Sequence, residues 1–233
     1  ELYHHAVKKF ETISAGATVI GTMYATSFEG DGSNLTGVSA VVPTDAQGNT
    51  VAGELAGGSF SGTDAEHNTL YGYDAGGDIT TGDSNIAIGW TAGGKINTGS
   101  DNVAIGASAA QNLTTGNQSV YIGANAGSNV TTINEGVAIG YNAGLYAGTD
   151  YGFTAVGFEA LKTEDANGKN LAIGYQALKT LDVGSDGFNT VIGYQAGTSM
   201  TTGIVNTLIG HQAGDALTTG NNNIAIGHEA LGS

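Results

Sequence analysis

The chain has 233 residues, of which 40 are glycine, one is proline and none is cysteine. Its formal charge of −15, from 21 acidic residues against 6 basic ones, argues against a nucleic-acid partner, because phosphate binding needs a basic face, and an anionic membrane surface would repel it. The lack of cysteine excludes a disulfide framework and a thiolate metal site, and no apolar run is long enough to span a bilayer.

The first forty residues predict a short β-rich segment. ETISAGATVIGTMYATSF, residues 11–28, alternates apolar and polar side chains in runs broken at Gly16 and Gly21, and GDGSN at 30–34 reads as a turn. A hairpin of this kind is marginal on its own, so we expect other chains to cover it. We assign residues 1–40 to this segment, 41–48 to a connector and 49–233 to the repeats that follow.

Residues 49–233 hold eleven copies of a short phrase centred on glycine, and such regularity decides the fold. Eight of the ten intervals between these glycines are 17 residues, and two are 19. Isoleucine precedes the glycine in eight copies, asparagine stands four residues before it in eight, and alanine stands three residues after it in all. The positions expected to be structural are Gly72, Gly89, Gly106, Gly123, Gly140, Gly157, Gly174, Gly193, Gly210, Gly227, Ala75, Ala92, Ala126, Ala160, Ala196 and Ala230.

One copy predicts one coil of a parallel β-solenoid. The alternation in NIAIG is the two-residue period of a strand, with Ile86 and Ile88 on one face and Ala87 on the other, and TTG words supply turns. Coils that pair in parallel at about 4.8 Å make a rod of roughly 50 Å from eleven copies. In the two longer intervals we expect extra residues to bulge from a turn without changing the register.

Burial by one chain alone is expected to be thin. One coil would bury about two isoleucine-sized side chains at about 1.5–3 kcal/mol each, which scarcely offsets the entropy of ordering it. The alanine columns, two residues before and three after the glycine, are therefore predicted to be surfaces where chains approach one another. Ser119, Gly136 and Phe153 replace the repeat asparagine and are expected to change surface detail only.

The words NNIAIGHEAL, NTVIGYQAG and NLAIGYQAL resemble the head repeats of trimeric autotransporter adhesins, the YadA-like head. They resemble more closely the longer variant found in phage tail-fibre proteins. The first segment, with F-x-GDGS-x-LTGV at 28–38, resembles the shaft repeats of marine phage tail fibres. The resemblance implies an all-β, left-handed parallel β-roll of about eleven 17-residue coils, assembled as a homotrimer with three chains side by side.

The resemblance also implies a function. It points to a structural and adhesive segment of a trimeric viral tail fibre, extracellular on the virion, that attaches to a host-surface glycan or protein and contacts other tail proteins. The alternative is a bacterial cell-surface adhesin with the same fold. A third interpretation, a monomeric solenoid that binds ice or crystalline polysaccharide through its threonine turns, is disfavoured by the irregular threonine spacing. The end at Ser233 fits either self-cleavage of a C-terminal chaperone or a truncated chain.

The residue after each repeat glycine forms a column that is often aromatic. Its aromatic members are Tyr73, Trp90, Tyr141, Phe158, Tyr175 and Tyr194. Such a column predicts either a sugar-binding strip or simple stacking of rings between coils, which is worth about 0.5–1.5 kcal/mol per pair. Stacking is the favoured interpretation, and glycan binding stays open.

His211 and His228 occupy successive rungs of the same column, which makes them candidates for a metal site or plain members of the column. No cofactor is expected. Glu159 and Glu229 fall at a repeat position that glutamine holds in other copies, so they do not read as a catalytic pair. No catalytic motif occurs, and the prediction is that the chain is not an enzyme.

Overall fold

The computed structural model describes residues 2–4, 7–13, 16–19, 45–61, 64–147, 152–163 and 168–232. The chain divides into two compact units, Glu1–Ala40 and Val41–Ser233. In the first unit β1 (Leu2–His4), β2 (Val7–Ile13) and β3 (Gly16–Val19) form an antiparallel sheet in the order β1-β2-β3. The expected break at Gly21 and the turn at 30–34 lie outside the described residues.

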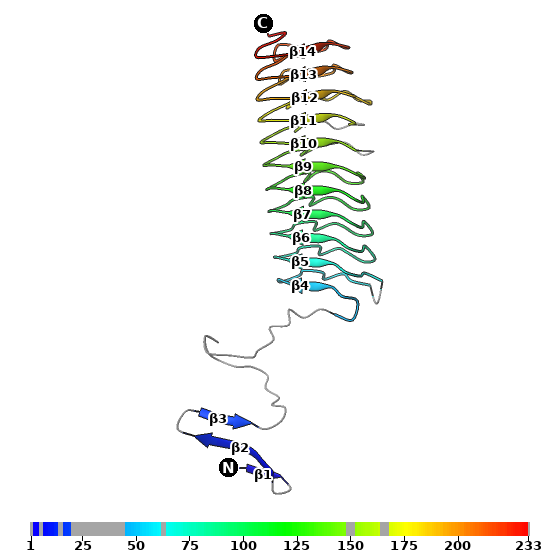
Figure 1. Ribbon diagram of the computed structural model, residues 1–233. Helices are drawn as coiled ribbons and strands as arrows, with labels where there is room; N and C mark the ends of the chain where they lie inside the picture. The colour runs from blue at the N-terminus through cyan, green and yellow to red at the C-terminus, as the bar shows by residue number, and fades with distance from the viewer. Residues whose placement is uncertain are drawn as a thin grey trace. The chain divides into compact units, whose positions relative to one another are not determined.

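The second unit is a parallel β-solenoid of about ten turns, as the repeat period predicts (Figure 1). Each copy contributes one three-residue strand, and the strands form one sheet in sequence order. They are β4 (Thr50–Ala52), β5 (Thr69–Tyr71), β6 (Ile86–Ile88), β7 (Val103–Ile105), β8 (Val120–Ile122), β9 (Val137–Ile139), β10 (Thr154–Val156), β11 (Leu171–Ile173), β12 (Thr190–Ile192), β13 (Thr207–Ile209) and β14 (Ile224–Ile226). No helix capable of crossing a membrane occurs in the part of the chain that the structure describes.

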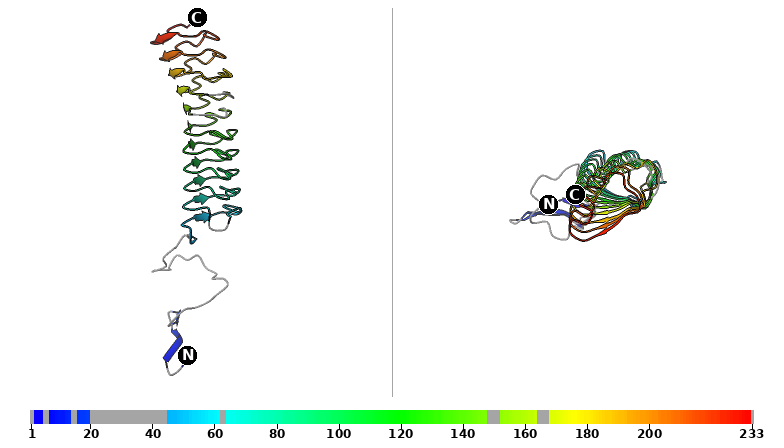
Figure 2. Two further views of the ribbon diagram at one scale, coloured as in Figure 1. Left: turned by 90° about the vertical axis from the view of Figure 1, so that its right-hand side faces the viewer. Right: turned by 90° about the horizontal axis from the view of Figure 1, so that it is seen from above.

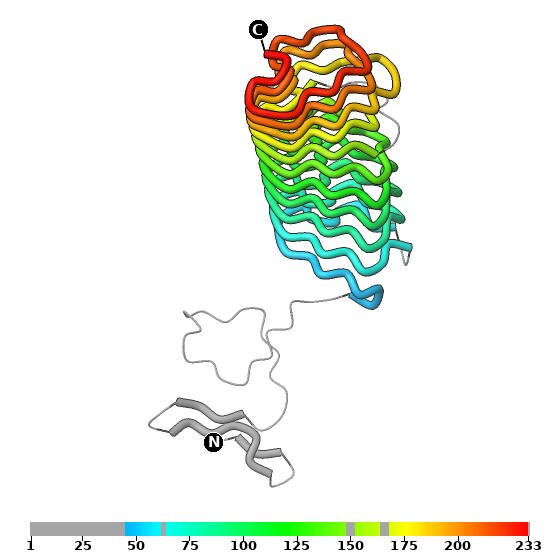
Figure 3. The backbone as a smooth tube through the Cα atoms, turned by 45° about the horizontal axis from the view of Figure 1, so that its top comes forward, coloured from blue at the N-terminus to red at the C-terminus, as the bar shows by residue number. Residues whose placement is uncertain are grey.

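Backbone hydrogen bonds join successive coils along their whole outline, not only at the strands. In the turns, Thr80 N–H donates to Asn97 O at 3.0 Å and Asp101 N–H donates to Asp83 O at 3.0 Å. The 19-residue intervals keep the register, since Thr50 pairs with Thr69. Seen from above, the coils lie over one another with a gradual rotation from coil to coil (Figure 2), and an oblique view shows the continuous stack (Figure 3).

The repeat glycine is required because two backbones meet there at close range. Gly106 has a φ of 128°, and a Cβ placed on it would lie 2.7 Å from the carbonyl carbon and oxygen of Gly123. No L side chain fits that conformation and that gap together. The glycine column thus sets the distance between coils.

The alanine columns face the interior of a single chain. Ala87 and Ala104, the middle residues of β6 and β7, are fully buried, and so are Ala75, Ala92 and Ala126 in the column after the glycine. The prediction that these columns are surfaces between chains is therefore wrong. Alanine is needed because the coil is too narrow for anything much larger at both positions.

The large core residue stands elsewhere, seven residues after the glycine. Ile79, Ile96, Leu113, Val130, Leu181 and Met200 hold this position and are fully buried. The strand isoleucines, expected to fill the core, point outward instead: Ile86 and Ile88 are 37% and 38% exposed. Sequence reasoning assigned the larger residues of the alternating strand to the inside, and the structure reverses this.

The repeat asparagine forms a buried ladder of side-chain hydrogen bonds. Asn102 Nδ2 donates to Asn85 Oδ1 at 3.1 Å and to Gly116 O at 2.7 Å, and Asn102 Oδ1 accepts from Ser119 N–H at 3.2 Å. Each asparagine thus bonds to the coils before and after it. The polar atoms of the side chain are satisfied inside the coil, which removes the penalty of burying an amide.

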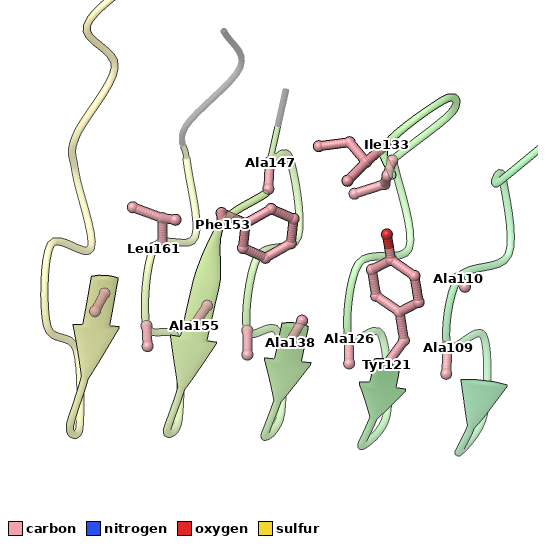
Figure 4. Close-up of a cluster of buried hydrophobic side chains, with 14 of the residues drawn as sticks. Ala109, Ala110, Tyr121, Ala126, Ile133, Ala138, Ala147, Phe153, Ala155 and Leu161 are labelled. Carbon is pink, nitrogen blue, oxygen red and sulfur yellow. The ribbon is translucent and has the colours of Figure 1, made fainter. Parts of the chain in front are cut away.

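Three coils lack the asparagine, and although Ser119 Oγ still accepts from Gly136 N–H at 3.0 Å, the ladder ends there. Tyr121 enters the interior at a position that is usually alanine, Phe153 replaces an asparagine, and both are almost completely buried (Figure 4). Gly136 makes room, since a Cβ there would lie 2.9–3.3 Å from Ile133, Phe153 and the Tyr121 hydroxyl. Burial raises the pKa of that hydroxyl. The expectation that these replacements change only the surface is wrong, because Phe153 puts a ring into the interior and Gly136 leaves the space that this ring and Tyr121 occupy.

We predict that Asn102→Ala destabilises the solenoid by about 2–6 kcal/mol. The substitution leaves the Gly116 carbonyl and the Ser119 N–H buried without these partners, at about 1–3 kcal/mol each. Urea unfolding followed by circular dichroism measures the change.

Asn112→Ala is the matched control. Asn112 also bridges coils, through Nδ2 to Ser128 O at 2.8 Å, but it is only half-buried, so water can replace its partners. Its cost should stay below about 1 kcal/mol. Equal costs for the two variants would show that the ladder is not a major source of stability.

Candidate functional site

The column after the repeat glycine lies on the outside of the coils. Its six aromatic members are all exposed, most of all Trp90 at 57%. Ala107 and Ala124 hold the column on the two coils between Trp90 and Tyr141. The aromatic column therefore consists of two separate parts, a short one at Tyr73 and Trp90 and a long one that begins at Tyr141.

The long part is a continuous stack of six rings. It runs through Tyr141, Phe158, Tyr175, Tyr194, His211 and His228. Successive ring centroids are 4.9–5.4 Å apart and the planes lie within 17° of parallel. This spacing is close to the ~4.8 Å between parallel strands, so the stack follows from the stacking of the backbone.

The stack limits how these rings could bind a sugar. A pyranose that packs on an aromatic ring needs a free ring face, and both faces of each internal ring are covered by its neighbours. The internal rings therefore offer their edges to solvent. Tyr141 differs, because the coil beneath it carries only the Ala124 methyl group. The geometry favours the packing interpretation for the long stack, and glycan binding by the column stays a prediction.

The sequence analysis missed the outward face of the strands as a surface. The first and third residues of each strand form two parallel columns of threonine, valine, leucine and isoleucine, with alanine or tyrosine only at Ala52 and Tyr71. No charged residue occurs in either column, although the chain carries a net charge of −15. The residues are half-buried to exposed along the length of the sheet. The alternation of the strand residues indicated two different faces, but the larger residues were assigned to the interior instead of the surface.

One carboxylate beside the aromatic stack is strongly paired. Glu159 lies 2.8 Å from Lys162 Nζ and 2.7 Å from Lys179 Nζ, and it accepts a hydrogen bond from Gln176 Nε2 at 2.9 Å. The hydrogen bonds from Lys162 and then Lys179 lower the pKa of Glu159 to about 2. Its environment stabilises the charged form, which suits a structural clamp between coils.

The two histidines of the column do come together with a third metal-ligating side chain. His211, His228 and Glu229 are exposed, and their ligand atoms all lie within 4.8 Å of one another. This is the only group of three such residues in the described part of the chain. The acidic residues of the turns do not gather into a comparable cluster there.

Comparisons of the chain with protein-family models, with curated proteins and with solved structures found no match.

We predict that Glu159 makes the stability of the solenoid fall as the pH drops from about 4.5 to about 2. The pKa of this carboxyl is lower in the folded state than its ordinary 4.5, so its contribution is present above pH 4.5 and is lost as the carboxyl takes up a proton. The contribution is about 1–3 kcal/mol near neutral pH. Glu159→Gln should remove this part of the pH dependence of the unfolding free energy.

Glu135→Gln serves as the control, because Glu135 is exposed and the change removes one charge without touching either lysine. It should leave the pH dependence nearly unchanged. A Glu159→Gln variant that kept the full acid sensitivity would contradict the role of the clamp.

Proposed function

We propose that this chain is a structural and adhesive segment of a homotrimeric viral tail fibre that attaches to a host surface. The observation that carries the proposal is the uncharged apolar face of the solenoid, formed by the outward columns of β4–β14. A soluble chain rarely exposes a contiguous apolar surface of this length unless a partner covers it. The number three comes from the resemblance of the repeats to trimeric fibre heads.

Another copy of the same chain suits this face better than an unrelated protein. The face repeats about every 4.8 Å along the solenoid and turns gradually with it, so a second identical solenoid presents the same spacing and the same twist and can match it rung by rung. β-branched residues dominate both columns and allow close packing of flat sheet faces. Association would bury side chains such as Ile86, Ile88 and Ile139, each of which is more than a third exposed.

The remaining surface suits a fibre that stays separate from its neighbours. The acidic residues lie off the strand face, and three chains would carry 3 × −15 = −45 in total. A charge of that size favours solubility and resists lateral association between fibres. Coils joined by hydrogen bonds around their whole outline give a stiff rod of about 48 Å, which suits a spacer that presents a binding surface at a distance.

A bacterial surface adhesin is the second candidate, because the same geometry would serve it equally well. Antibodies raised against the solenoid distinguish the two. Labelling of purified virions supports the tail-fibre proposal, and labelling of the outer surface of uninfected cells supports the adhesin.

We predict that the chain has a native mass of about 70 kDa, three times its 23.2 kDa, by light scattering coupled to size exclusion. Ile105→Lys combined with Ile122→Lys places two charges on the apolar face and should convert the trimer to monomer. Thr98→Lys combined with Thr115→Lys, on exposed turns of the same two coils, should leave the mass unchanged.

Circular dichroism checks that both double variants keep their β structure. A wild-type chain that stays monomeric at micromolar concentration would overturn the proposal, as would a trimer that persists with both lysines on the apolar face. Loss of the trimer in the turn control alone would place the interface on the opposite side of the coil.

A further inference from the structure

On the coils of β13 and β14, a carboxylate that ring stacking does not explain lies beside the last two rings of the stack. His211 and His228 follow the glycines of these two coils, and Glu229 follows His228. The backbone holds the two coils in register here, since Glu229 N–H donates to His211 O at 2.9 Å and Gly227 N–H donates to Ile209 O at 2.8 Å. The three side chains are therefore brought together by a rigid frame, although they are exposed.

Glu229 is one of three carboxylates in its column, with Asp74 and Glu159. The same position holds glutamine on the three preceding coils, at Gln176, Gln195 and Gln212. On the coil before those, Glu159 is neutralised by two lysines. Glu229 has no such lysine in the described part of the chain, and its ion-pair partner there is His228, whose Nε2 lies 3.6 Å from Glu229 Oε1. A carboxylate thus appears on the one coil pair where both column residues are imidazoles.

A second observation also indicates a cation. Asp215 Oδ1 is buried without a hydrogen-bond partner in the described structure. Asp215 lines a polar depression together with Gln212, Glu229 and Gly232. Glu229 therefore belongs both to the group with the histidines and to a depression that a second carboxylate also lines. Two carboxylates that share a depression repel one another unless a positive charge joins them.

We propose that His211, His228 and Glu229 form a binding site for a divalent transition-metal ion such as Zn²⁺, with Asp215 in the surrounding shell. Two imidazole nitrogens and one carboxylate oxygen are a ligand set that Zn²⁺ and Ni²⁺ accept, whereas Ca²⁺ and Mg²⁺ prefer oxygen ligands alone. All three ligands belong to one chain, so the site does not depend on the trimer.

Binding requires a local rearrangement of the two rings. They are stacked with centroids 4.9 Å apart and planes 7° from parallel, so their nitrogen lone pairs do not yet converge. Ligand atoms around a tetrahedral ion with bonds of about 2.0–2.2 Å lie about 3.4 Å apart, against the present limit of 4.8 Å. Both imidazoles are exposed, and His211 must give up part of its stacking on Tyr194 to tilt toward the ion. A metal ion would then clamp the two coils together across the outside.

Titration with ZnCl₂ followed by calorimetry tests the site in the full chain. The chain has five histidines, and His4→Ala with His5→Ala removes the other adjacent pair, so this double variant is the starting protein. We expect it to bind one Zn²⁺ per chain. His211→Ala and His228→Ala should each weaken binding at least tenfold, and Glu229→Gln should weaken it several-fold.

His67→Ala is the matched control. His67 is an exposed histidine whose Nδ1 lies 3.9 Å from Glu66 Oε2, which gives it the same kind of pair without a second histidine. It should leave Zn²⁺ affinity unchanged, and CaCl₂ should not compete with Zn²⁺. Thermal melts without metal check that every variant is folded.

Two results would overturn the site. One is Zn²⁺ binding no tighter than in a variant that lacks both His211 and His228. The other is equal loss of affinity in the His67→Ala control. Competition by Ca²⁺ would count against imidazole ligation and assign the binding to the carboxylates.

Discussion

The close stacking of each coil on the next, at the spacing of one β-strand, is the constraint on which the whole solenoid depends. Two features of the repeat enforce it. The glycine column allows backbones to meet where a Cβ such as one on Gly106 would collide with the next coil. The asparagine ladder, seen at Asn85 and Asn102, then ties each coil to its neighbours from inside through satisfied hydrogen bonds. Because every coil repeats the same step, residues at equivalent positions form continuous columns along the solenoid. The chemistry of the surface is therefore set column by column.

Some columns fill the interior of the coil and others form its surface. Alanines and one or two larger apolar residues per coil fill a narrow interior, so the coil needs no partner chain to complete its core. The strand face, in contrast, is left apolar and uncharged on the outside, and association with further copies is the use we propose for it. The aromatic column beside it changes along the rod, from the short part at Tyr73 and Trp90 through the ring stack to the histidines. The architecture is thus uniform along the axis while its surface chemistry is not, which lets one repeat serve as spacer and as binding surface.

The period, the strand positions and the parallel register were predictable because they depend on the repeat alone, and the structure confirms them. The face of the strand that points inward was not predictable, because NIAIG alternates large and small side chains and either set could be buried. The width of the coil decides which side chains are buried. That width depends on the close approach of backbones at residues far apart in sequence. The core position of Ile96 was missed for the same reason, since it stands in a turn rather than a strand. The pairing of His211 with His228 followed from the period, whereas the approach of Glu229 and Asp215 depended on how the turns fold.

The distance between spin labels on exposed turns tests the constant step most directly. The chain has no cysteine, so labels on Thr98→Cys with Thr202→Cys, and on Thr81→Cys with Thr219→Cys, report single pairs when labelled chains are diluted with unlabelled ones. These pairs are six and eight coils apart, which predicts backbone separations of about 29 Å and about 38 Å. Narrow distance distributions for the two label pairs, with means that differ by about 10 Å, would agree with a constant step between coils. Equal distances, or broad distributions without a step, would contradict it.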